Sequence, residues 1–330
     1  MADGRCHAAP GDAAGAAADE FALIDLILAQ QPLLDTTVRV GPGDDAAVLL
    51  PPPGHDLVCS VDTLIEGVHF LPDTPPALAT QRALAVNLSD LAAMGARPGP
   101  CLLALTHPEL SPAIAAAVGR GFAIAARGTG AQLVGGNLAR GPFTLSVTVN
   151  GWVPAGAALL RCGARPGDLV CLSGSVGGAG EALASLRAAP ARLASLEGEV
   201  PAALRRYLTP TPRLALGIAL RGLATACIDV SDGLLADAAQ LARASGVRLE
   251  LALERVPFAG AREAALVAGD DYELLFTIPE EAASRLEALA AELALPLTAI
   301  GRVTEGRGLA LEDLGRSIAA PARLGWNHFA

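Results

Sequence analysis

The sequence of 330 residues contains no lysine, so arginine supplies all 24 of its cationic side chains. P-loop kinases, lysine-dependent protein kinases and Schiff-base enzymes all need an ammonium group at the reacting centre. The absence of lysine therefore excludes these classes. Any phosphate group that the protein binds must be held by a metal ion, by arginine or by backbone N–H groups.

Long apolar runs are absent too, although 52% of the residues are hydrophobic. No stretch of about 18 uninterrupted apolar residues could cross a bilayer, so we expect no membrane association. Residues 1–20 are rich in alanine and glycine but are broken by Pro10 and several acids, unlike a signal peptide. We expect these residues to form a disordered tail on a cytoplasmic protein.

Excess positive charge and paired cysteines are also missing. The net charge of −10 is the wrong sign for a protein that binds nucleic-acid backbones, so we expect no nucleic-acid partner. The cysteines show no CxxC spacing, and most lie in apolar strand-like runs. This pattern predicts buried, reduced thiols rather than a zinc site or disulfides, at Cys6, Cys59, Cys101, Cys162, Cys171 and Cys227.

The chain alternates between strand-like and helix-like segments and exceeds the usual size of one domain. We predict domains over 21–153 and 154–330, with a boundary in the Pro/Gly-rich segment near 153–166. In the first domain we predict helices at 19–31, 76–95 and 111–130, and strands at 36–41, 46–50, 57–64, 101–106 and 143–153. In the second we predict strands at 169–174, 226–230 and 272–278, a helix at 233–245, further Ala/Leu/Arg-rich helices, and a final helix and strand.

The segment VGPGDDAAVLL, residues 40–50, places two adjacent aspartates between a glycine turn and an apolar run. Such carboxylates are costly near a core unless something positive meets them. Alone, each similar aspartate has a structural interpretation: Asp232 as a helix N-cap, Asp90 as a solvated helix residue. Together they favour Mg²⁺ ions shared with nucleotide phosphates. The set is Asp44, Asp45, Asp62, Asp90, Asp229, Asp232, Asp270 and Asp271.

Two other segments have competing interpretations. The glycine-rich segment 173–183 follows a strand and opens a helix, as a phosphate-binding turn does. It lacks the spacing of a dinucleotide fingerprint, so we expect a tight strand-to-helix connection. We interpret the arginines of LRRYLTPTPR, residues 204–213, as a solvated helix face rather than a phosphate clamp, in a helix that the Thr-Pro repeat ends.

An ordered series of motifs carries a family resemblance over nearly the whole chain after residue 20. The motifs are GPGDDAAVL, SVDTLIEGVHF, ALAVNLSDLAAMGARP, LVGGNLARG, RCGARPGD, IDVSDGLLAD and GDDYELLFT. In this order they resemble the thiamine-monophosphate kinase family, within the wider superfamily of aminoimidazole-ribonucleotide synthetase and selenophosphate synthetase. The VHF and GWNHF strings resemble the thiamine-phosphate branch in particular.

The resemblance implies a two-domain, PurM-like (aminoimidazole-ribonucleotide synthetase-like) fold with ATP in the interdomain cleft. An α/β N-terminal domain would pair its sheet with a second subunit in a homodimer, and an α+β domain would follow. The implied activity is ATP-dependent phosphorylation of thiamine monophosphate to thiamine diphosphate, the last step of thiamine diphosphate biosynthesis.

The resemblance also implies site residues. Several Mg²⁺ ions would bind Asp45, Ser60, the backbone of Val61, Asp62, Asp90, Asn137, Asp229 and Asp232. ATP would contact Gly136, Asn137, Arg161 and Ser231, and thiamine monophosphate would contact His69, Asp270 and Trp326. An imidazole, a carboxylate and an indole suit an acceptor that offers a phosphate, an aminopyrimidine and a cationic ring. Without the motifs, these three would be interpreted as a satisfied histidine, an acid at a strand start and a core aromatic.

The sequence departs from the family pattern at two places. The family has Gly-Gly-Asp-Thr where this chain has Gly-Gly-Asn137-Leu138, so one metal ligand is a neutral amide. Asp270 stands where glutamate is common, and its reach is shorter by one methylene. We expect retained activity with a changed metal requirement.

The acceptor phosphate is already ionised near neutral pH, so the mechanism needs no general base. We expect direct in-line transfer, with Mg²⁺ and Arg161 screening the repulsion between the anions and with no phospho-enzyme. Two alternatives remain: a sister enzyme that activates another small acceptor with ATP, and a non-catalytic metal-binding or regulatory module. Asn137 is the one feature that favours the second.

Overall fold

The computed structural model describes residues 19–32, 34–194, 196 and 199–328. Most of the predicted tail, and Cys6 with it, lies outside these ranges. Glu20 begins the first helix, so the final residue assigned to the tail is helical. Within the described ranges, no helix is long and apolar enough to span a bilayer.

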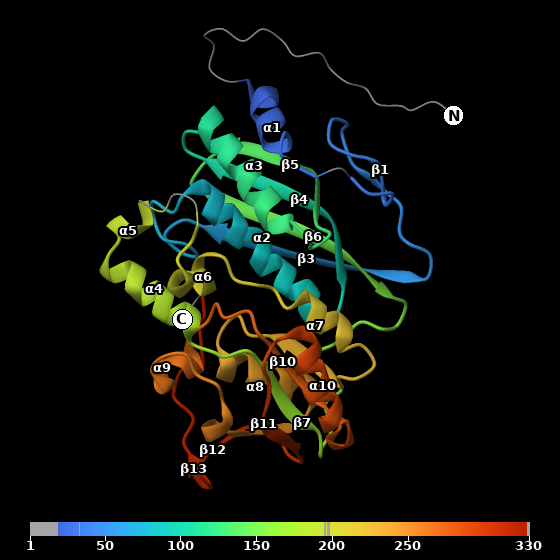
Figure 1. Cartoon of the computed structure of the whole chain (residues 1–330), viewed down its shortest axis with the longest axis vertical. Coiled ribbons are helices and arrows are strands. Elements are labelled where there is room, and N and C mark those ends of the chain that lie inside the picture. Colours follow the sequence, from blue (N-terminus) through green and yellow to red (C-terminus); the bar gives the residue numbers. More distant parts are fainter. Residues whose placement is uncertain (1–18, 33, 195, 197–198, 329–330) are drawn as a thin grey trace.

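The first half of the chain is built on a four-stranded sheet (Figure 1). The strand order is β3-β6-β4-β5, with β4 and β5 parallel and the other two pairs antiparallel. The elements are α1 (Glu20–Leu28), β1 (Val38–Val40), β2 (Val48–Leu49), β3 (His55–Ile65), α2 (Pro76–Ala93), β4 (Arg97–His107), α3 (Pro112–Ala126), β5 (Gln132–Arg140) and β6 (Thr144–Pro154).

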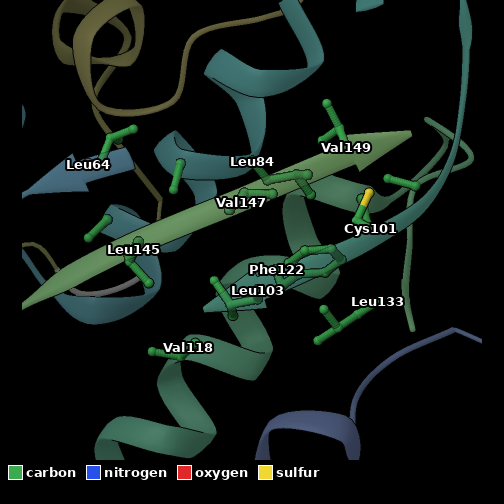
Figure 2. Close-up of a cluster of buried hydrophobic side chains, with 14 of the residues drawn as sticks. Leu64, Leu84, Cys101, Leu103, Val118, Phe122, Leu133, Leu145, Val147 and Val149 are labelled. Atoms are coloured by element: carbon green, nitrogen blue, oxygen red, sulfur yellow. The ribbon is translucent and has the colours of Figure 1, made fainter. Parts of the chain in front are cut away.

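The core of this half lies between the sheet and helices α2 and α3 (Figure 2). Alternation along β6 buries Leu145, Val147 and Val149, because successive side chains of a strand point to opposite faces. These residues share a cluster with Leu84 of α2 and Phe122 of α3. One face of the sheet is therefore a packed core.

The opposite face of the same sheet, which we call the open face, carries exposed apolar side chains. Leu57 and Val61 on β3 are 56% and 58% exposed, and Leu102 on β4 is 40% exposed. Cys59 lies between the first two and is exposed as well. Apolar side chains gathered on one sheet face are typical of a protein interface.

The second half of the chain is a seven-stranded sheet covered on both faces. Leu172 of β7 and Leu275 of β10 pack with α8, whereas Cys171 and Phe276 pack with α10 on the other side. Burial on both faces explains the continuous apolar runs of these strands. The order is β13-β12-β9-β11-β7-β10-β8, and β12 with β9 is a parallel pair.

The remaining elements complete this half. They are β7 (Leu169–Ser173), α4 (Gly178–Ala188), α5 (Ala191–Ala194), α6 (Ala202–Leu208), α7 (Leu214–Ala219), β8 (Ala226–Asp229), α8 (Leu234–Ser245), β9 (Arg248–Ala252), η1 (Leu253–Arg255), α9 (Arg262–Val267), β10 (Leu274–Ile278), η2 (Glu280–Ala282), α10 (Ala283–Leu293), β11 (Leu297–Thr304), β12 (Gly308–Asp313) and β13 (Arg316–Ile318).

Helix α2 packs into both halves. Leu84 and Leu88 lie in the first core, while Ala92 clusters with Leu216 of α7 in the second. A Cβ added at Gly217 of α7 would lie 1.9 Å from the carbonyl oxygen of Ala92, so this close approach requires glycine. The two halves are joined through α2 as well as through the connecting chain.

Several sequence predictions need correction. The prediction of buried thiols is confirmed for Cys101, Cys171 and Cys227 but is wrong for Cys59 and Cys162, which are exposed; all five are free. Strands β5 and β9 were not predicted, and three strands stand where one final strand was expected. The first sheet ends at 154 and the second begins at 169; the predicted domain boundary between them stays a prediction.

The arginines of segment 204–213 are not all solvated. Arg213 binds the fully buried carboxylate of Glu273 through two hydrogen bonds of 2.6 and 2.7 Å. Arg206 also contacts this carboxylate, at 3.2 Å. Arg205 pairs with the exposed Glu199. Arg206 and Arg213 are drawn inward because the buried carboxylate of Glu273 requires cationic partners. The interpretation as a solvated helix face therefore holds only for Arg205.

Candidate active site

A cavity of about 1050 Å³ lies between the two halves of the chain. Its walls come from β3 and the loop after it, α2, α4, α6, the loops before α8 and β10, and segment 323–328. Motifs far apart in the sequence meet here. The predicted site residues that line it are Asp62, His69, Asp90, Arg161, Asp229, Ser231, Asp232, Asp270 and Trp326.

Strand β3, helix α2 and strand β8 supply the carboxylates. Ser60 and Asp62 pair in register with buried residues of β6 and so point to the α2 side of the sheet, whereas Val61 points to the open face. Asp90 on α2 accepts a hydrogen bond of 2.6 Å from the Ser60 hydroxyl. Asp229 ends β8 and is only 3% exposed. Hydroxyl and carboxylate oxygens from separate elements are thus brought to one region.

These aspartates repel one another in partly dehydrated surroundings. Burial, and then the charge of Asp90, raises the pKa of Asp229 to about 7. Burial, and then Asp90 and Asp232, raises the pKa of Asp62 to about 6. Burial also raises the pKa of Asp90 and of Asp232, although Arg161 acts in the opposite direction on both. The cavity has an excess of negative charge that a cation would relieve.

The donor chemistry fits Mg²⁺ held jointly by protein and phosphate. This hard cation prefers carboxylate, carbonyl and hydroxyl oxygens and keeps waters and substrate phosphates among its ligands. In the part of the chain that the structure describes, no three His, Cys, Asp or Glu side chains converge closely enough to hold a metal ion by themselves. The arrangement therefore fits ions that bridge aspartates and a nucleotide, and it does not fit a closed protein cage.

His69 and Trp326 form another wall of the cavity. The backbone N–H of Ile65 donates to Nδ1 of His69 at 3.1 Å, so Nε2 carries the ring hydrogen in the neutral form. Burial, followed by the nearby His328, lowers the pKa of His69, which favours this neutral imidazole at neutral pH. Trp326 is 49% exposed, so it is not a core aromatic, and its backbone N–H donates to the carbonyl of Asp232 at 2.8 Å.

Asp237 supports the site but was not predicted from the sequence. Its Oδ2 accepts hydrogen bonds from the backbone N–H groups of Ser231, Asp232 and Gly233, at 3.0, 3.0 and 3.1 Å. The carboxylate thus satisfies the turn that precedes α8, the role the sequence had offered to Asp232 as an N-cap. Asp232 is left free to face the cavity. The signal in the sequence was an acid in the first turn of the following helix.

Arg82 and His328 line the cavity and were also missed. The His328 ring centroid lies 5.0 Å from that of His69 and 5.8 Å from that of Trp326. Arg82 is 2% exposed and forms an ion pair with Asp270 at 2.5 Å. The only signal for Arg82 was its spacing on α2, eight residues before Asp90, which places both on one helix face.

Asp45 and Gly136 do not line this cavity. Asp45 is exposed in the turn between β1 and β2, a hairpin at the right of Figure 1, away from α4 and α9. A Cβ at Gly136 would lie 1.9 Å from the carbonyl oxygen of Leu103, so the glycine is required by the pairing of β5 with β4. That packing role does not depend on ATP.

Asn137 lies on the open face of the first sheet. The register of the sheet places Asn137 of β5 opposite Ala104 of β4. Ala104 lies opposite Ser146 of β6, and Ser146 lies opposite Thr63 of β3. Residues opposite one another share a face, and the next residue along a strand takes the other face. Asn137 and Asp62 therefore face opposite sides of the same sheet.

The glycine-rich segment 173–183 is a strand-to-helix connection, as expected. It joins β7 to α4, with Gly177 at φ 94° before the first helical turn. The N–H groups of Gly177 and Ala179 donate to the carboxylate of Asp271 at 2.5 and 3.2 Å. Because a buried carboxylate already occupies this helix terminus, the interpretation as a phosphate-binding turn is wrong.

Comparisons with known proteins identify the family of this chain. Residues 43–153 match the N-terminal domain model of AIR synthase related proteins, and residues 165–313 match the C-terminal domain model. Thiamine-monophosphate kinase of Salmonella typhimurium is 38% identical over 326 residues, covering 95% of this chain and 99% of the relative. These matches define a two-domain AIR synthase related protein with the PurM-like fold.

Two solved structures are similar over most of their length. Thiamine-monophosphate kinase from Stenotrophomonas maltophilia superposes with a TM-score of 0.80 at 42% identity, covering 91% of this chain and 98% of that one. AaThiL complexed with AMPPCP and TMP gives a TM-score of 0.71 at 34% identity, covering 94% and 97%. The chain belongs to the thiamine-monophosphate kinase family.

Proposed function

We propose that this protein transfers the γ-phosphoryl group of ATP to thiamine monophosphate, forming thiamine diphosphate and ADP. The observation that carries the proposal is the hydrogen bond between the Trp326 backbone N–H and the Asp232 carbonyl. It joins a residue of the predicted acceptor site to a residue of the predicted metal site within one cavity. The relative complexed with AMPPCP and TMP supports the same pair of ligands.

The chemistry proceeds by direct in-line transfer. An oxygen of the acceptor phosphate forms a bond to the γ-phosphorus while the bond to the β-phosphate bridging oxygen breaks, and ADP leaves with that electron pair. The acceptor oxygen is already ionised, so no side chain removes a proton. The guanidinium of Arg161, which lines the cavity beside the aspartates, lowers the repulsion between the two anions.

Several Mg²⁺ ions would be held between the nucleotide and this chain. Bound Mg²⁺ supplies charge neutralisation and alignment of the phosphates. In the cavity the proposed ligands are the side chains of Asp62, Asp90, Asp229 and Asp232, with Ser60 bound to Asp90, and Arg161 and Ser231 are proposed to bind ATP. The raised pKa values of Asp62 and Asp229 support this assignment. Asp45, Asn137 and the backbone of Val61 as metal ligands, and Gly136 and Asn137 as ATP ligands, are proposed from the family resemblance alone, since none of them lines the cavity of this chain.

The acceptor is assigned to His69, Asp270 and Trp326. A neutral His69 offers Nε2–H to a phosphate or ring group, and Trp326 offers an aromatic face to a cationic ring. Asp270, whose side chain is 31% exposed, offers a carboxylate oxygen to the aminopyrimidine. The presence of all three residues on the cavity that contains the aspartates favours this acceptor over that of a sister enzyme.

We further propose that the protein is a cytoplasmic homodimer that pairs the open faces of its first sheets. The exposure of Leu57, Val61 and Leu102 supports this arrangement, because pairing would bury them. A dimer of this kind presents Asn137 of each chain to the other copy. Asn137 would then lie between the two paired sheets, on the side of each sheet opposite Asp62.

The test is ADP release by the purified chain with ATP and Mg²⁺. Thiamine monophosphate, free thiamine and no acceptor are compared, and the product is identified by mass. We expect thiamine diphosphate, and ADP release only with the monophosphate. ATP binding without turnover would mean a different acceptor or a loss of activity through Asn137. Failure to bind ATP would favour the non-catalytic module.

A further inference from the structure

Arg82 is a cationic residue buried in the wall of the cavity. Its side chain donates hydrogen bonds from three nitrogens: Nη2 to Oδ1 of Asp270 at 2.5 Å, Nη1 to the carbonyl of Tyr207 at 2.5 Å, and Nε to the carbonyl of His69 at 3.3 Å. The guanidinium also lies 4.3 Å from the Tyr207 ring centroid. One side chain thus ties α2 to the loop after β3, to α6 and to the loop before β10.

The loop before β10 holds Asp270 in an uncommon conformation. Asp270 and Tyr272 have φ values of 71° and 51°, in the left-handed region that is rare outside glycine. Their backbone N–H groups donate to the carbonyls of Ser231 and Val230, both at 2.8 Å. The backbone of Asp270 is therefore fixed against the loop that carries Asp232.

The carboxylate of Asp270 has one oxygen bound and one available. Oδ1 accepts hydrogen bonds from Arg82 at 2.5 Å and from the Tyr272 hydroxyl at 3.0 Å. Among the described residues, none donates to Oδ2, and the side chain is 31% exposed to the cavity. Two donors on one oxygen fix the rotation of the carboxylate, so the direction of Oδ2 is set before a ligand arrives.

The ion pair also determines what kind of group Oδ2 attracts. With Arg82 attached, the pair has no net charge, so Asp270 serves as a hydrogen-bond acceptor rather than as the counter-ion of a free cation. An N–H group on a neutral ring is the matching partner. In the proposed acceptor this group is the amine of the aminopyrimidine.

Helix α2 sets the distance between this end of the cavity and the metal end. Arg82, Val86 and Asp90 all line the cavity and recur every four residues, which places them along one helix face. The eight residues from Arg82 to Asp90 correspond to about 12 Å along the axis. Helix α2 therefore sets the separation between Asp270, which Arg82 holds, and the proposed metal site around Asp90.

We propose that Arg82 is a positioning residue that directs Oδ2 of Asp270 toward the ring amine of thiamine monophosphate and thereby sets acceptor affinity and specificity. The proposal rests on the proposed function for the identity of the acceptor. It adds a residue that does not itself touch the reacting atoms.

The first test compares Arg82→Lys with the wild-type protein in steady-state kinetics. Lysine keeps the charge but cannot donate to three separated acceptors at once. We expect KM for thiamine monophosphate to rise about tenfold or more, with KM for ATP and kcat changed less than about threefold. The control is Arg221→Lys, which removes a donor to the Gly95 carbonyl at 2.6 Å but does not line the cavity. The control should leave both KM values unchanged.

A milder variant and an analogue keep the test decisive if Arg82→Lys fails to fold. Tyr272→Phe removes only the second donor to Oδ1, and we expect it to raise KM for thiamine monophosphate by about threefold to tenfold with KM for ATP unchanged. An acceptor analogue with a carbonyl in place of the ring amine should bind the wild-type protein about tenfold more weakly. Tyr272→Phe, and Arg82→Lys if it folds, should discriminate less between the two acceptors.

The outcomes separate the two proposals. Calorimetric binding of thiamine monophosphate without turnover overturns the proposed function alone. The role of Arg82 is overturned if Tyr272→Phe, and Arg82→Lys if it folds, bind the monophosphate as tightly as the wild type does. It is also overturned if these variants lose thermal stability but keep the wild-type KM for the acceptor. If the wild-type protein does not bind the monophosphate at all, both proposals are wrong.

Discussion

Because aspartates of the site are buried, we expect the ligand-free protein to lose stability as the pH rises. In the folded protein the pKa of Asp229 rises from its ordinary value of 3.8 to about 7, chiefly through burial and then through Asp90. Between these two values the folded state holds a proton that the unfolded state has released. The slope of the unfolding free energy with pH is therefore negative in this window.

The magnitude follows from the shift. At about 1.36 kcal/mol per pKa unit, a rise from 3.8 to about 7 corresponds to about 4 kcal/mol. This stability is present near pH 4, is lost progressively as the pH rises, and is fully lost above pH 7. Asp62, with a pKa of about 6, changes in the same direction. The lowered pKa of His69 acts oppositely, below its ordinary value of about 6.5.

The assay is urea unfolding between pH 4.5 and 8.5, with EDTA or with saturating Mg²⁺ and a non-hydrolysable ATP analogue. Asp229→Asn is the control, because the amide oxygen can still accept from the Ser89 hydroxyl, now at 2.6 Å, but cannot titrate. We expect a clearly flatter slope for Asp229→Asn in EDTA, and a flatter wild-type slope when cation and nucleotide are bound. Equal slopes for the two proteins in EDTA would refute the reasoning.

Three further predictions concern other parts of the molecule. Asp90→Ala should abolish turnover, even at saturating Mg²⁺, while circular dichroism stays near wild type and the unfolding midpoint does not fall, because a charge that repels Asp229 and Asp62 is removed; near-normal activity would remove Asp90 from the metal site. Asp237→Ala should lower the free energy of unfolding by about 3 kcal/mol or more, because three backbone N–H groups lose their acceptor. Denaturant unfolding measures this loss. Leu102→Glu on the open face should convert a dimer into monomers in sedimentation velocity, whereas Ile124→Glu, at the similarly exposed position on α3, should not; unchanged mass for both would contradict the proposed interface.

Sequence reasoning predicted the elements whose periodicity is strong. Helix α2 and the buried strands β7 and β10 follow from continuous or helically spaced apolar residues. Strand β5 was missed because Gly135, Gly136 and Asn137 interrupt its alternation. Its extended form depends on pairing with β4, which no local pattern records.

The sequence also predicted only part of the site, because no local pattern records how the strands pair or which distant residues meet. The motifs identified which aspartates belong together, but not which side of a sheet each one faces. Asn137 and Asp62 face opposite sides of the first sheet, because the register of a strand decides which face each of its residues takes. Arg82 was missed because its partner, Asp270, is 188 positions away in the sequence, and a lone arginine in an amphipathic helix resembles a solvated one.

The sharing of helix α2 between both cores has a consequence for motion. A wide hinge opening of the two halves would expose Ala92 and its apolar neighbours on α7 and break the bonds from Arg82 to α6 and to the loop before β10. Such an opening would disrupt packing and hydrogen bonds of both halves together, so we expect the molecule to unfold in a single cooperative transition. Ligand exchange must then depend on smaller displacements at the rim, where α4 and segment 323–328 border the cavity.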